Sequence, residues 1–105
     1  MADDIVVYKN RRNVIGVSLG TDVSADTFES EIREKAMTTA PLIATWDVAF
    51  LTDGTDGELV LTLDDSELDT VTQKSGYMDI KKISGGEPYA VFPPVKVKFQ
   101  DVVTE

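Results

Sequence analysis

Carboxylates around a turn are the first residues in this sequence whose chemistry could serve a function. Asp53, Asp56 and Glu58 lie in or beside residues 52–57, which contain two Asp-Gly pairs. Carboxylate oxygens are hard ligands that suit Ca²⁺, an ion that accepts flexible geometry. The spacing matches neither the EF-hand loop nor a Gly-rich nonapeptide repeat, and Asp-Gly is also a strong tight-turn signal. The sequence therefore favours a plain hairpin turn, with Ca²⁺ binding by these three residues as the alternative.

A second acidic group follows in residues 64–69: Asp64, Asp65, Glu67 and Asp69. Paired carboxylates can hydrolyse a glycosidic bond, but only where they converge across a sugar-binding cleft. The chain contains no His and no Cys, which removes the commonest general base and the thiolate nucleophile, and its Ser and Thr residues have no base to activate them. We expect no catalytic residue, no cofactor and no enzymatic activity. A small acidic hydrolase ranks last among the alternatives.

Five of the ten basic residues form two small groups. Lys9, Arg11 and Arg12 fall in a polar turn near the start of the chain, and Lys96 and Lys98 alternate with apolar residues near its end. These five residues are candidates for docking an acidic partner surface, including the acidic part of another copy. The simpler interpretation of the first group is an ordinary solvated turn.

The overall charge excludes some partners. The 105 residues include 19 acidic and 10 basic side chains, a net charge of −9, and residues 36–73 contribute −8 of it without one Lys or Arg. Phosphate affinity depends on Lys and Arg, so neither nucleic acid nor an anionic membrane is expected as a partner. No apolar run approaches the roughly 20 residues that span a bilayer. The acidic start, Met1-Ala2-Asp3-Asp4, is unlike a signal peptide and predicts synthesis in a cytoplasm.

Hydrophobic residues recur mostly at every second position, which is typical of half-buried strands. Thr27–Arg33 fits both a strand and a helix. Residues 64–73 indicate a short helical turn, with Ser66 as its cap. Pro93-Pro94 interrupts the last strand. The strands expected are residues 5–8, 14–19, 42–50 with Trp46 as core anchor, 58–63, 76–82 and 89–99. The pattern predicts an all-β fold: one domain over residues 1–105, an antiparallel β-sandwich of about seven short strands with one short helical turn.

Several sequence segments resemble one family of structural proteins. They are GTDVSADTF (20–28), EIREK (31–35), PLIATW (41–46), ELVLTLD (58–64), GYMDI (76–80), VKV (95–97) and VVT (102–104). Their order is similar to that in small β-sandwich proteins of phage and prophage tails and baseplates, in particular the immunoglobulin-like domain at the N-terminus of baseplate upper proteins. The resemblance covers nearly the whole chain from about Tyr8. It implies an immunoglobulin-like sandwich in which Phe28–Arg33 is a strand that runs into a loop, and it identifies no catalytic residue.

The resemblance implies a non-enzymatic virion protein of a tailed bacteriophage or prophage, made in the bacterial cytoplasm. Such a subunit would contact other virion proteins in the tail, baseplate or neck, and we expect it to self-associate. The alternative is an adhesion module for carbohydrate or cell surfaces, aided by Ca²⁺ and using Tyr77 or Tyr89 as a sugar platform. We further predict that the acidic residues cluster on one part of the surface, away from the basic residues of the terminal strands. That asymmetry would suit head-to-tail stacking of copies.

Overall fold

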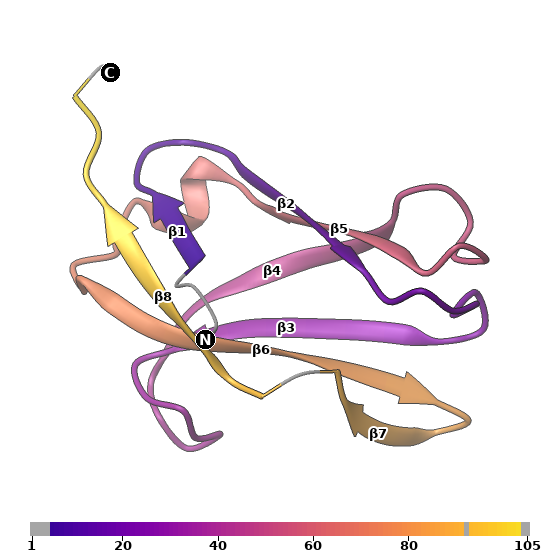
Figure 1. The fold of residues 1–105 in the computed structure, drawn as a ribbon. Helices are drawn as coiled ribbons and strands as arrows, with labels where there is room; N and C mark the ends of the chain where they lie inside the picture. The colour runs from indigo at the N-terminus through magenta and orange to yellow at the C-terminus, as the bar shows by residue number, and fades with distance from the viewer. Residues whose placement is uncertain (1–4, 92, 104–105) are drawn as a thin grey trace.

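The computed structural model describes residues 5–91 and 93–103, in which the chain forms eight strands and one short 3-10 helix (Figure 1). The expectations for Met1–Asp4 and Thr104 therefore lie outside the described residues. The elements are β1 Ile5–Tyr8, β2 Asn13–Ser18, β3 Thr27–Arg33, β4 Leu42–Phe50, β5 Glu58–Leu63, η1 Asp65–Leu68, β6 Ser75–Ser84, β7 Glu87–Ala90 and β8 Val95–Gln100. The all-β prediction is confirmed, including the strand at β3 and the short helical turn.

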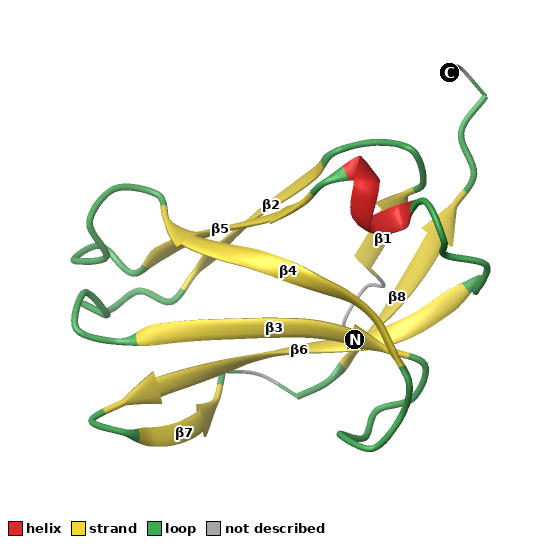
Figure 2. Ribbon diagram, turned by 180° about the vertical axis from the view of Figure 1, so that it is seen from behind, coloured by secondary structure: helices red, strands yellow, loops and turns green. Residues whose placement is uncertain are grey.

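The strands form one continuous sheet in the order β1-β8-β6-β3-β4-β5-β2, with β7 beside β6. β4 joins two halves of this sheet, because residues 42–46 pair with β3 and residues 47–50 pair with β5. Figures 1 and 2 show that β4, β5 and β2 lie on one side, and β3, β6, β8 and β1 on the other. The sheet thus folds over on itself.

Two details of the predicted sheet are wrong. The first strand is not antiparallel to its neighbour, because β1 runs parallel to β8 with Ile5 opposite Val97. The described residues form eight strands in place of about seven, because residues 89–99 do not make one strand. Pro93-Pro94 divides that segment into β7 and β8, and both pair with the same edge of β6. Proline supplies no backbone donor, so pairing stops there and resumes beyond it.

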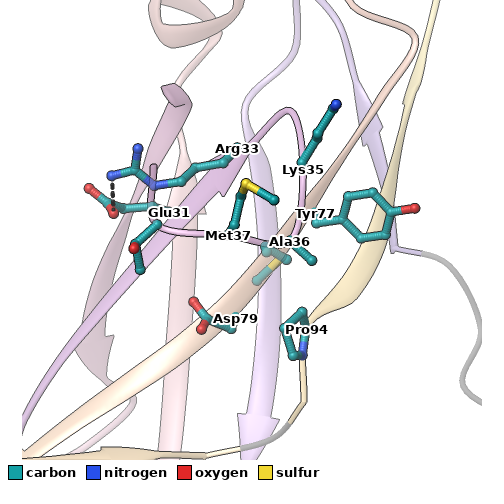
Figure 3. Close-up of a pocket in the computed structure, with 10 residues that line it drawn as sticks. Glu31, Arg33, Lys35, Ala36, Met37, Tyr77, Asp79 and Pro94 are labelled. Carbon is teal, nitrogen blue, oxygen red and sulfur yellow. Dashed lines mark hydrogen bonds and ion pairs between the residues drawn. The ribbon is translucent and has the colours of Figure 1, made fainter. Parts of the chain in front are cut away.

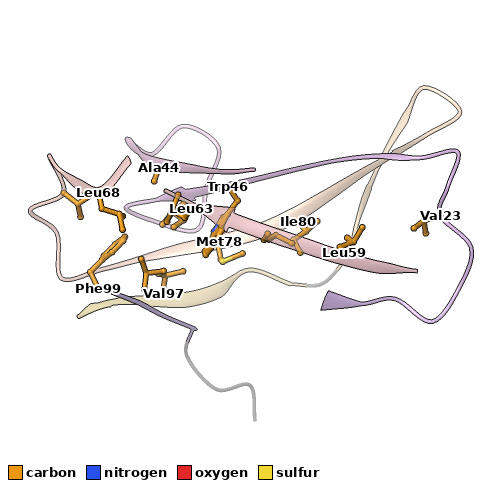
Figure 4. Close-up of a cluster of buried hydrophobic side chains, with 14 residues drawn as sticks. Val23, Ala44, Trp46, Leu59, Leu63, Leu68, Met78, Ile80, Val97 and Phe99 are labelled. Atoms are coloured by element: carbon orange, nitrogen blue, oxygen red, sulfur yellow. The ribbon is translucent and has the colours of Figure 1, made fainter. Parts of the chain in front are cut away.

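The core lies between the two halves and is filled by the inward residues of the strands other than β7, whose four residues are all exposed (Figure 4). Leu59, Leu61 and Leu63 alternate along β5 and are fully buried, and Trp46 on β4 is only 3% exposed. This confirms Trp46 as the core anchor. Burying such side chains contributes about 1.5–3 kcal/mol each, and this contribution holds the two halves together.

The helical element is shorter than expected and begins without the predicted cap. Asp64 occupies the N-cap position of η1, and no side chain there makes a capping hydrogen bond, so the role assigned to Ser66 is wrong. Leu68 and Val71 point into the core and fix the connection from β5 to β6. No helix in the described part of the chain is long and apolar enough to cross a membrane.

Candidate interaction surface

The outer face of β1, β8 and β6 gathers aromatic, aliphatic and basic side chains. Along β8, Val97 and Phe99 point into the core, so Lys96 and Lys98 point outward. Strand pairing places Lys98 between Val6 of β1 and Ser75 of β6, and Lys96 beside Tyr77. The tyrosine–lysine face, as we name this surface, consists of Val6, Tyr8, Tyr77, Lys96 and Lys98, all exposed.

A small pocket borders the tyrosine–lysine face where the loop between β3 and β4 crosses the outer side of β6 (Figure 3). Its volume is about 140 Å³, and Tyr77, Pro94 and Met37 contribute to its wall. Met37 projects from the loop and is 55% exposed. The pocket gives an otherwise even strand surface a recess beside an aromatic ring.

Arg33 holds the loop over this pocket. Its guanidinium donates to the Ala40 carbonyl at 2.8 Å and to the Glu31 carboxylate at 3.0 Å. The loop is also closed by the Glu34 amide, which donates to the Pro41 carbonyl. Hydrogen bonds from a charged donor are stronger than those between neutral groups, so Arg33 restrains the pocket wall.

The other three basic candidates lie in the turn between β1 and β2, which Asn13 holds together. The buried Asn13 side chain accepts from the Tyr8 amide and donates to the carbonyls of Tyr8 and Arg11, at 2.9–3.0 Å. Sequence reasoning missed Asn13. The alternation of the strand could have indicated its role. Asn13 shares the inward face with Ile15 and Val17, and a buried side-chain amide must find hydrogen-bond partners.

Each end of this basic turn carries an ion pair. Lys9 lies 3.6 Å from Asp101, and Arg12 lies 3.5 Å from Asp64. The prediction that acidic and basic residues occupy separate regions is therefore wrong at this point. Both members of the Arg12 pair are exposed, so this pair contributes little to stability and can exchange for other partners, whereas the Lys9 side chain is half-buried.

The acidic residues do not form one cluster either. Asp53, Asp56 and Glu58 lie at the start of β5, whereas Asp64, Asp65, Glu67 and Asp69 follow its end. A strand of six residues is about 20 Å long, so β5 separates the two groups. The acidic stretch is therefore divided between opposite ends of the fold.

Two of the three Ca²⁺ candidates, Asp53 and Asp56, use their carboxylates in turn hydrogen bonds. Asp53 accepts from the hydroxyl and amide of Thr55, and these bonds lower its pKa. Asp56 accepts from the Glu58 amide and the Thr52 hydroxyl. Within residues 5–91 and 93–103, no three acidic side chains are grouped to hold a metal ion. The geometry therefore brings Asp53, Asp56 and Glu58 together as a loop and not as a ligand set.

The two tyrosines proposed as sugar platforms are far apart on β6 and its hairpin. Tyr77 belongs to the tyrosine–lysine face, whereas Tyr89 lies on β7 opposite Lys82. The Lys82 ammonium sits 5.5 Å from the centre of the Tyr89 ring. One face of Tyr89 is thus covered, whereas Tyr77 stands beside a recess.

Comparison with models of known protein families finds no match, and no curated protein matches the sequence.

Proposed function

We propose that this chain is a non-enzymatic structural subunit of a tailed bacteriophage or prophage particle, located in the tail, baseplate or neck. The observation that carries the proposal is the tyrosine–lysine face. Tyrosine is enriched at protein interfaces because it combines apolar area with a hydrogen-bonding group. Lys96 and Lys98 share this face with the two tyrosines, so on a chain of net charge −9 the face suits an acidic neighbour.

We further propose that the fold is an immunoglobulin-like β-sandwich. Its support is the pair of sheet halves that face each other across one core, with a buried tryptophan, in about 100 residues. The resemblance to immunoglobulin-like domains of baseplate proteins supports both this fold and the place in a phage particle. Such a domain works by surface complementarity, because its strands hold exposed side chains in fixed positions.

Labelling of particles tests the proposed function. A gold-conjugated antibody raised against this chain is expected to decorate intact, DNA-filled particles at a constant position along the tail axis. Antibody raised against an unrelated host protein serves as the control. Labelling found only in the lysate of infected cells, with bare particles, contradicts the assignment.

A further inference from the structure

β2 is the longest strand at the border of the sheet, and one of its edges has no neighbour. It pairs only with β5, and among the described residues no strand lies along its other side (Figure 1). Its sequence, NVIGVS, contains no Pro, Lys, Arg, Asp or Glu, the residues that normally block edge pairing. By contrast, the border strand β7 has four residues and contains Glu87 and Pro88. β2 is therefore an open, unprotected edge.

The direction of its backbone groups follows from the pairing with β5. The Leu19 amide donates to the Gly57 carbonyl, so Val17 and Ile15, at two-residue spacing, also direct their backbone groups toward β5. The residues between them direct theirs to the free edge. These are Val14, Gly16 and Ser18, all exposed.

The folded chain does not require a glycine at position 16. The φ of Gly16 is not positive, and a Cβ atom there would meet only the Leu59 carbonyl, at the ordinary contact distance of 4.0 Å. Glycine weakens a strand because it has no side chain to pack. Residue 16, in the middle of the free edge, can thus be replaced without a clash inside the chain, which makes it a suitable position for testing that edge.

The two turns that directly adjoin β2 differ in charge. The turn before it carries Lys9, Arg11 and Arg12, of which Lys9 is paired with Asp101 and Arg12 with Asp64, the first acid after β5. Beyond its other end lie the loops 19–26 and 51–57, which contain no Lys or Arg. They are joined by the bond from the Val23 amide to the Gly54 carbonyl. The acidic residues of these loops are Asp22, Asp26, Asp53 and Asp56.

We propose that the free edge of β2 binds the same edge of a second copy, antiparallel, about a two-fold axis at Gly16. Gly16 then faces its own equivalent, Val14 faces Ser18, and each such pair exchanges its backbone hydrogen bonds. Ile15 and Val17, half-buried in one copy, cover each other across the junction. The antiparallel direction places the basic turn of each copy against the acidic loops of the other, whereas a parallel pair would oppose like charges.

The role of this dimer rests on the proposed function, since the dimer would be the unit that joins the particle. It needs no particle for its test. Analytical ultracentrifugation of the full chain is expected to show a dimer. Gly16→Pro removes an outward amide without touching the β5 ladder and is expected to abolish the dimer. Gly16→Ala keeps the amide and is the matched control, which should stay dimeric. A wild-type monomer, or a dimeric Gly16→Pro protein, overturns the proposal.

A second pair of variants covers the case in which Gly16→Pro does not fold, which circular dichroism would show. Arg11→Gln with Arg12→Gln is expected to raise the dimer dissociation constant about tenfold or more, because it removes charge at the junction. Lys96→Gln with Lys98→Gln removes the same charge from the tyrosine–lysine face and should leave the constant unchanged. An equal effect of the two double variants refutes the β2 junction. Particle labelling would still decide the proposed function.

Discussion

Asp22 and Asp53 stabilise two adjacent loops in the same way. Each carboxylate accepts from an amide and a hydroxyl two residues further along, Ser24 for Asp22 and Thr55 for Asp53. The amide and hydroxyl of Ser24 lower the pKa of Asp22, and the hydroxyl and amide of Thr55 lower that of Asp53. At the residue scale these aspartates therefore act as turn-forming groups.

The lowered pKa of Asp53 predicts a response to acid. Its folded-state pKa lies below the usual 3.8, so the ionised carboxylate favours the folded chain above that pH. The contribution is lost as the pH falls through the lowered folded-state pKa. Thr55→Val removes the hydroxyl donor, and carbon-13 NMR titration should show the pKa of Asp53 rising toward 3.8. Thr52→Val, which removes a hydroxyl from Asp56, is the control. An unchanged Asp53 titration in Thr55→Val contradicts this explanation.

Gly57 joins the same two loops through a close approach that no side chain allows. Its φ is +75°, and a Cβ there would collide with the backbone of Thr21. Gly20 also has positive φ, at +69°, but open space around it. In urea unfolding, the free energy of unfolding should fall by about 3 kcal/mol for Gly57→Ala and by about 1 kcal/mol for Gly20→Ala. Equal losses would mean that the contact with Thr21 does not matter.

At the scale of elements, the loop between β3 and β4 depends on one side chain. Replacing Arg33 by Met removes its hydrogen bonds to Ala40 and Glu31, which stabilise the loop by about 1.5–3 kcal/mol. Amide hydrogen exchange in residues 34–40 is therefore expected to become about tenfold faster or more. Lys81→Met breaks the exposed pair with Glu29 and should leave this exchange unchanged. An unchanged exchange rate in Arg33→Met would show that other contacts stabilise the loop.

Local pattern predicted the elements well where alternation was clean. The expected bounds of Leu42–Phe50 and Glu58–Leu63 match β4 and β5, because one face of each strand is apolar and buried. The interruption at Pro93-Pro94 was predicted from the missing donors, but not that one strand ends there and another begins beyond it. Neither the parallel pairing of β1 with β8 nor the return of β7 and β8 to one edge of β6 could be predicted. Which strands pair with each other depends on the packing of the whole sheet, and this leaves no pattern in the local sequence.

The candidate site was predicted only in part. Lys96 and Lys98 point outward, as their alternation with Val97 and Phe99 indicates. Tyr8 and Val6 join them only because β1 lies beside β8, a contact between the two ends of the chain. The pocket under Arg33 was missed for a similar reason, since a loop formed it by crossing a strand that is distant in sequence.

For the whole molecule, the net charge has a different meaning from the one that the sequence suggested. The −8 of residues 36–73 is divided by β5, and the basic turn lies beside its second group of acids. The molecule is thus not polarised from one end to the other. Its two distinct surfaces are the tyrosine–lysine face and the free edge of β2, and the proposed role needs contacts of this kind with neighbours or with other copies.

We propose that this chain is a structural part of a phage particle, and its presence in purified particles can be measured. The most direct measurement is quantitative mass spectrometry of particles purified by density gradient, with host cytoplasmic proteins as the contamination control. We expect the chain at a fixed copy number relative to the other virion proteins, unchanged by repeated purification. A chain that is absent from purified particles, or that declines with the contaminants, contradicts the claim.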